Sequence, residues 1–169
     1  GNPAIRASVQ SRDIYITDSI VADNQGNALS IFGPQSVTVV NSEISNNLGY
    51  GVQVSNGSWN IKIFNSKISG NNIGVEFRKC YYGCLIQDSI IAQNKTYGLM
   101  ITGGTFLNED PLVLRTTIAY NAQVSGANLY LAASLDTPAH LQFNNSTLAR
   151  GLGVFPNCEI SAVNRNFSR

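Results

Sequence analysis

Apolar positions along this chain recur with a period of about two dozen residues. In one register an aliphatic residue returns at spacings of 23 to 30 residues: Ile5, Leu29, Val52, Val75, Leu99, Leu129 and Val154. In a second register a hydroxyl residue is followed two positions later by an aliphatic one: Ser19, Ser42, Ser66, Ser89, Thr116 and Ser146. Repetition at this period indicates a solenoid, in which each repeat packs on the next.

Each repeat contains three short strand-like pieces separated by turns. In one of them, Ile61 and Ile63 alternate with polar residues, as in a half-buried strand, and an Asn-Ser turn follows. A shorter apolar piece around Ile68, a Ser-Gly-Asn bend and a final strand at Gly74–Phe77 complete the repeat. This pattern is typical of one coil of a parallel β-helix. The sequence therefore predicts an all-β, single-stranded parallel β-helix solenoid of about six coils of 23–30 residues.

Two polar columns accompany the apolar ones. Asparagines share one register, at Asn24, Asn47, Asn71, Asn94 and Asn121. Stacked amides can bond to the coils above and below, so we expect an asparagine ladder. A second column occupies another turn: Asp18, Asn41, Asn65, Asp88, Arg115 and Asn145. Turn chemistry explains both columns, and a ligand-binding row is the alternative.

The segment Val37–Val54, which reads VTVVNSEISNNLGYGVQV, resembles the repeat of the right-handed parallel β-helix (pectin-lyase-like) superfamily. That superfamily includes pectin and pectate lyases, polygalacturonases, alginate epimerases and phage tailspikes. The resemblance extends from about Ala4 to about Glu159. It implies the right-handed fold, carbohydrate ligands and a place outside the cell or on a cell or virion surface. The activity itself must be argued from a site.

The domain boundaries follow from the same repeat. Residues 1–163 are expected to form the β-helix domain and residues 164–169 a polar tail. Ile5 already belongs to the last strand of a coil, and solenoids need capped ends. We therefore expect the chain to be a piece of a longer β-helix protein.

Composition narrows the class of partner. The net charge is +1 and charged residues make up 12% of the chain, so no electrostatic footprint for nucleic acid is present. No apolar run reaches the length of a membrane-spanning helix. A polysaccharide or glycan is the expected partner.

Catalytic signatures are sparse. Cleavage by two carboxylates needs a pair of acids, and no Asp pair with a nearby His and Arg is found. The epimerase-type aromatic-Gly-x-Asp-Pro-His motif is absent, and His140 lies near the far end. The sequence thus favours a non-catalytic carbohydrate-recognising or adhesive module of a larger protein. The alternatives are a polysaccharide-processing enzyme (lyase, epimerase or glycoside hydrolase) and a structural shaft or oligomeric fibre or tailspike segment.

The candidate sugar-binding set lies in the middle coils. Glu76 and Arg78 are expected on one outward strand, with Lys79, Tyr81 and Tyr82 in the following loop. Rings stack on apolar sugar faces, and charges bond hydroxyls or uronates. The alternative interpretation is a solvated loop with a weak Glu-Arg pair.

An enzyme would draw on a wider set of residues. If the protein were a lyase or epimerase, Glu76, Arg78, Asp88 and Arg115 would be the first residues to mutate, with Arg115 or Lys79 neutralising a uronate.

No cofactor is predicted, with one possible exception. Glu109, Asp110 and Asp136 lie in loops that follow the same strand on successive coils, where they could hold calcium together with backbone oxygens. Ordinary acidic turn residues explain them equally.

Two further features concern partners and redox state. An apolar stripe is expected on the outer side of the first strands, at Val40, Phe64, Leu85, Leu112 and Leu114. Such a stripe suggests a second copy of the chain or another segment as its cover, unless a bulge turns several of these residues inward. Cys80 and Cys84 are close enough to pair across a tight loop, with Cys158 left over; buried inert thiols are the alternative.

Overall fold

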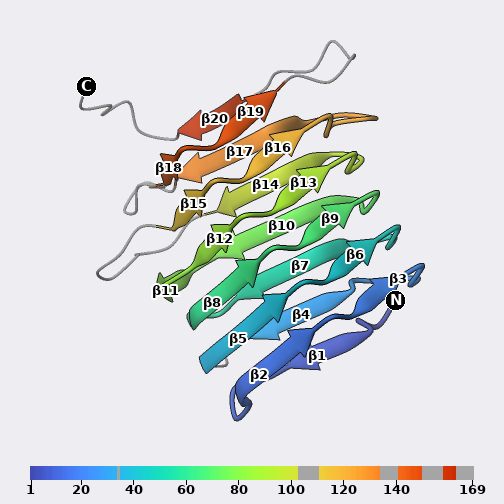
Figure 1. Ribbon diagram of the computed structural model, residues 1–169, viewed down its shortest axis with the longest axis vertical. Coiled ribbons are helices and arrows are strands. Elements are labelled where there is room, and N and C mark those ends of the chain that lie inside the picture. Colours follow the sequence, from blue (N-terminus) through green and yellow to red (C-terminus); the bar gives the residue numbers. More distant parts are fainter. Residues whose placement is uncertain (34, 103–110, 134–140, 150–157, 163–169) are drawn as a thin grey trace.

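Three parallel β-sheets, named A, B and C here, form the protein in a computed structural model (Figure 1). The structure describes residues 1–169 except 34, 103–110, 134–140, 150–157 and 163–169. The chain passes from sheet A to sheet B to sheet C and back, and every pair of neighbouring strands is parallel. This arrangement confirms the predicted all-β parallel solenoid.

Successive coils contribute one strand after another to each sheet, apart from an extra short strand in sheet B. Sheet A contains β1 (Ile5–Ala7), β4 (Leu29–Phe32), β7 (Tyr50–Ser55), β10 (Ile73–Arg78), β14 (Tyr97–Thr102), β17 (Ala127–Ala133) and β20 (Cys158–Ala162). Sheet B contains β2 (Arg12–Thr17), β5 (Gln35–Val40), β8 (Ser58–Phe64), β11 (Cys80–Tyr82), β12 (Leu85–Gln87), β15 (Leu112–Leu114) and β18 (Gln142–Asn144). Sheet C contains β3 (Ile20–Ala22), β6 (Glu43–Ser45), β9 (Lys67–Ser69), β13 (Ile90–Ala92), β16 (Thr117–Ala119) and β19 (Thr147–Ala149).

The core consists of columns of equivalent aliphatic side chains. Val52, Val75 and Leu99 pair in register on sheet A and are fully buried. Ile44, Ile68, Ile91 and Ile118 form the matching column of sheet C. Because each residue contacts its counterparts above and below, the hydrophobic stabilisation runs along the whole stack.

The first apolar column needs one correction. It follows Ile5, Leu29, Val52, Val75, Leu99 and Leu129 as predicted, but Leu129 pairs with Cys158 rather than Val154. The spacing is longer than expected because eight residues separate β17 from β18, whereas two separate β7 from β8. Val154 itself lies outside the described residues.

The second polar column marks a backbone requirement. Asp18, Asn41, Asn65, Asp88, Arg115 and Asn145 stand at the bend between sheets B and C, and all six have φ between 45° and 50°. Asn and Asp adopt this left-handed conformation most readily among residues with a side chain. Turn chemistry therefore explains the column, with Arg115 as an unusual occupant.

A hydroxyl ladder follows this bend. Each member from Ser42 to Ser146 accepts the backbone N–H of its counterpart one coil earlier at 3.0–3.3 Å. All six hydroxyls, from Ser19 onward, also donate to the carbonyl two residues before at 2.6–3.0 Å. The hydroxyl register in the sequence is thus the trace of a continuous hydrogen-bond chain.

The predicted asparagine ladder is present at the bend between sheets C and A. From Asn24 to Asn121, the backbone and side-chain N–H groups of each asparagine donate to the Oδ1 atom of the next at 2.7–3.2 Å. After Asn121 the next acceptor is Asn128, which in turn donates to the Ala149 carbonyl. Asn47, Asn71 and Asn94 are completely buried, so each amide depends on its neighbours for satisfaction.

Removing one rung should therefore destabilise the fold. Asn71→Ala deletes the Oδ1 acceptor of two Asn47 donors and leaves these groups buried and unpaired. We expect a loss of about 3 kcal/mol in the free energy of unfolding, measured by denaturant titration. Asn65→Gly removes an exposed amide at a left-handed position and should change it far less. Equal losses in the two variants would contradict the ladder's role.

Candidate carbohydrate-binding surface

Glu76 is the centre of a polar chain on the outer face of sheet A. It pairs with Gln53 on β7 and with Met100 on β14, as the repeat register predicted. Gln53 Nε2 donates to Glu76 Oε2 at 3.0 Å and Thr102 Oγ1 donates to Glu76 Oε1 at 3.3 Å. Glu76 is only 3% exposed. Its carboxylate is thus held by two neutral donors from neighbouring strands.

Tyr50 reports the electrostatics beside this carboxylate. Burial raises the pKa of the Tyr50 phenol, the negative charge of Glu76 raises it further, and the positive charge of Arg78 partly offsets both effects. Tyr50 therefore remains a neutral hydroxyl at physiological pH, available as a hydrogen-bonding group on this face.

A hollow lies where the strands of sheet A end. It has a volume of about 270 Å³ and is lined by Phe32, Gln53, Ser55, Asn56, Arg78 and Lys79. Arg78 and Lys79 are exposed, and a positive φ of 58° at Lys79 turns the chain out of sheet A. The Arg6 guanidinium lies 5.5 Å from the centroid of the Phe32 ring. Cations therefore surround one end of this sheet.

Aromatic rings lie at the adjoining end of sheet B. Trp59 is 44% exposed and meets Tyr82 edge to face, with ring centroids 5.6 Å apart. Tyr81 packs on the backbone of Gly57: a Cβ atom there would approach the Tyr81 ring to 2.3 Å, and φ at this residue is 75°. Glycine is therefore required at position 57 for space and for backbone conformation.

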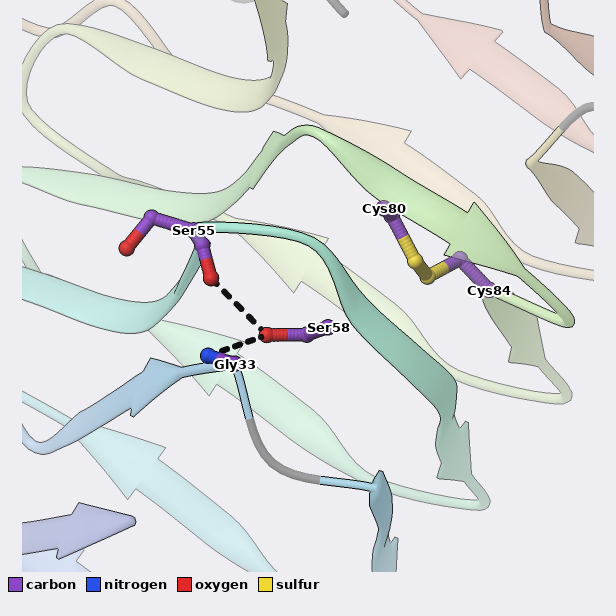
Figure 2. Close-up of a disulfide and its surroundings, with 5 residues drawn as sticks. All are labelled: Gly33, Ser55, Ser58, Cys80 and Cys84. Carbon is purple, nitrogen blue, oxygen red and sulfur yellow. Dashed lines mark hydrogen bonds between the residues drawn. A yellow bond between two sulfur atoms is a disulfide. The ribbon is translucent and has the colours of Figure 1, made fainter. Parts of the chain in front are cut away.

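A disulfide closes the segment that carries both tyrosines. Cys80 and Cys84 are bonded, with Cα atoms 6.3 Å apart, and both are buried (Figure 2). Beside them, Ser58 Oγ donates to the Ser55 carbonyl at 2.9 Å and accepts the Gly33 N–H at 3.2 Å. The cross-link restricts Tyr81 and Tyr82 to one short, braced segment. The pairing that the sequence left open is thus present.

Asp88 and Arg115 form a separate pair. Arg115 donates to both carboxylate oxygens of Asp88, at 2.6 and 2.7 Å, from the next coil. These hydrogen bonds, with a further one from Gln87, lower the pKa of Asp88 from 3.8 to about 2. The pair lies at the bend where the sheet B strands end, beside a groove of about 530 Å³ that follows this bend over several coils.

The seven predicted site residues therefore divide into two groups. Glu76, Arg78, Lys79, Tyr81 and Tyr82 gather around β10 and β11, where sheet A passes into sheet B. Asp88 and Arg115 occupy the opposite end of the sheet B strands, and their charges satisfy each other.

Sequence reasoning missed Trp59 and Phe32. Ile61 and Ile63 point inward, so strict alternation would bury Trp59 on the same side. A positive φ of 54° at Asn60 interrupts the alternation and turns the indole outward. The available signal was the Asn-Gly pair before this strand, which marks an irregular turn.

Other predicted features meet the structure only in part. The acidic residues proposed for calcium, Glu109, Asp110 and Asp136, lie outside the described residues. Within the described part of the chain, no group of three or more His, Cys, Asp or Glu side chains could hold a metal ion. The described residues also contain no helix long and apolar enough to cross a membrane.

The apolar stripe lies on the outer face of sheet B. Val40 pairs with Phe64, and Leu85 pairs with Leu112, all half-buried. Gln87 stands between Phe64 and Leu114 in the register, so the stripe consists of two short rows.

Comparison with known families agrees with this architecture. The chain belongs to the right-handed β-helix family: the family model described as "Right handed beta helix region" matches residues 4–166. No match was found among curated proteins or solved structures. The family defines the fold, and the choice of ligand must rest on the surface described above.

The disulfide can be counted chemically. In a Cys158→Ser variant unfolded without reductant, a thiol reagent should titrate no free thiol, and two after reduction, since the sequence has three cysteines. Reduction should lower the free energy of unfolding by about 2 kcal/mol, from the entropy of closing so short a loop. Two reactive thiols before reduction would show that Cys80 and Cys84 are not bonded.

The Asp88–Arg115 pair predicts a pH dependence. Because folding lowers the pKa of Asp88, its stabilisation is complete above the ordinary pKa of 3.8 and disappears as the pH falls through about 2. Asp88→Asn should lower Tm slightly at neutral pH and leave it unchanged near pH 2. Asp18→Asn, at the same bend but without an ion pair in the structure, is the control. A pH-independent difference in Tm for Asp88→Asn would contradict this assignment.

Proposed function

We propose that this chain is a non-catalytic carbohydrate-recognising module whose contact surface runs over the edge between sheets A and B in the middle coils. The observation that carries the proposal is the exposed Trp59–Tyr82 pair beside the disulfide-closed segment. Aromatic faces pack against the apolar C–H faces of sugars, and the indole N–H and phenol O–H can bond hydroxyls.

The polar groups around the rings support the same ligand class. Asn56, Lys79 and Arg78 lie beside the aromatic segment and offer amide and cationic donors. Hydroxyl-rich ligands need several such donors and acceptors around an apolar platform. The surface also crosses several stacked coils, so it suits an extended, repeating polymer better than a single small molecule.

The environment of Glu76 supports binding without catalysis. Among the described strands β7, β10, β14 and β17 of sheet A, Glu76 is the one acidic residue, so a two-carboxylate mechanism lacks its second group there. Its hydrogen bonds to Gln53 and Thr102 give it a structural task.

We further propose an extracellular location, or one on a cell or virion surface. The Cys80–Cys84 disulfide supports it, because disulfides persist mainly in oxidising compartments. A second candidate role is a segment of an oligomeric shaft, in which another copy of the chain covers the outward Val40, Phe64, Leu85 and Leu112.

Glycan-array binding tests the carbohydrate proposal. Trp59→Ala and Tyr82→Ala should each reduce binding by about tenfold or more, as expected for loss of a stacked ring. Tyr120→Ala removes an exposed ring at the bend between sheets C and A and should leave binding unchanged.

The array result also separates the alternatives. Absence of binding to every glycan would contradict the carbohydrate proposal and favour the shaft. Release of reducing ends or of unsaturated products from a bound polysaccharide would show an enzyme.

A further inference from the structure

The hollow at the end of sheet A contains a buried polar atom without a partner. Ser55 is 6% exposed, and its Oγ atom has no hydrogen bond. Figure 2 shows that the Ser55 carbonyl oxygen accepts from Ser58, whereas Oγ points away from Ser58. Buried hydroxyls are nearly always paired, so an orphan at the wall of a hollow indicates a group that binds there.

The charges around the hollow favour an anion. Among the described residues the ion pairs are Lys67–Glu43 and Arg115–Asp88, so neither Arg78 nor Lys79 is neutralised by a carboxylate. Arg6, stacked on Phe32, adds a third cation at this end of the sheet. The one nearby carboxylate, that of Glu76, is directed at Gln53 and Thr102.

The hydrogen-bonding groups fit an oxyanion in geometry as well as in charge. A planar guanidinium presents two parallel N–H donors to a carboxylate or sulfate, and the Ser55 hydroxyl has an unused donor. The side-chain amide of Asn56, from the same wall, can add another. Arg78 and Lys79 are exposed and flexible, so they can move aside to admit the group and then close on it.

From these observations we infer that the hollow formed by Ser55, Asn56, Arg78 and Lys79 is an oxyanion-binding subsite, which receives a carboxylate or sulfate substituent of a glycan. The inference rests on the proposed carbohydrate-binding function, to which it adds a preference for anionic sugars. Phe32 and Gln53 form the remaining walls. The rings at Trp59 and Tyr82 would hold the neutral part of the same ligand.

The test compares three sugars that differ at one carbon. Galactose, galacturonic acid and galactose carrying a sulfate ester at the same carbon are titrated into ¹⁵N-labelled protein, and amide shifts are followed by NMR. We expect saturable shifts at Ser55, Asn56, Arg78 and Lys79 with one or both anionic sugars, weakened by high salt, and none with galactose. Which anionic sugar binds distinguishes a carboxylate from a sulfate ligand.

Variants assign the effect to this hollow. Arg78→Gln should weaken anionic binding by about tenfold, in line with loss of a charge-assisted hydrogen bond, and Ser55→Ala by several-fold. Lys95→Gln, which removes an exposed lysine at the bend between sheets C and A, should change nothing. Equal weakening by Arg78→Gln and Lys95→Gln would reduce the effect to general charge attraction and overturn the subsite.

The outcomes also separate this inference from the proposed function. If neutral glycans bind through Trp59 and no anionic sugar shifts the Ser55 amide, the subsite is wrong and the carbohydrate module stands. If anionic sugars shift the Ser55 amide while the array shows no glycan binding, the oxyanion subsite stands and the module is wrong.

Discussion

Backbone hydrogen bonds between equivalent residues of successive coils are the constraint on which the rest of the structure depends. They fix Val52 beside Val75 and Val75 beside Leu99, so each residue meets its own counterpart about 4.8 Å away along the stack. A position that carries an aliphatic side chain becomes a core column. One that carries an asparagine becomes a ladder, and buried amides are tolerated because every rung has neighbours on both sides.

The candidate site lies where this regularity breaks. At the bends between sheets B and C and between sheets C and A, hydroxyl and amide ladders satisfy the polar groups coil after coil. The edge between sheets A and B differs from coil to coil: Asn56 and Gly57 shape one turn, Lys79 and the disulfide-closed segment the next. Irregular turns leave groups that no neighbouring coil can pair, and Ser55 is one of them.

The period of the sequence was enough to predict the sheet order, both asparagine-containing columns and the outward position of Glu76. These features depend on equivalent residues stacking, which a repeat reveals directly. The exposure of Trp59 depends on the left-handed φ of Asn60, a local departure that alternation hides. Likewise, insertions between β17 and β18 shifted the last apolar position from Val154 to Cys158. The grouping of Asp88 with Arg115, away from Glu76, follows from which bend each occupies, and the repeat alone does not assign chemistry to one bend over another.

Trp59 gives the most direct measurement of the central claim, that the edge between sheets A and B binds glycans. It is the one tryptophan of the chain, and its ring is partly exposed. Titration with a glycan whose affinity is known from calorimetry should shift and saturate the tryptophan emission with the same dissociation constant. Heat of binding with an unchanged emission spectrum would place the glycan elsewhere on the solenoid and contradict this account.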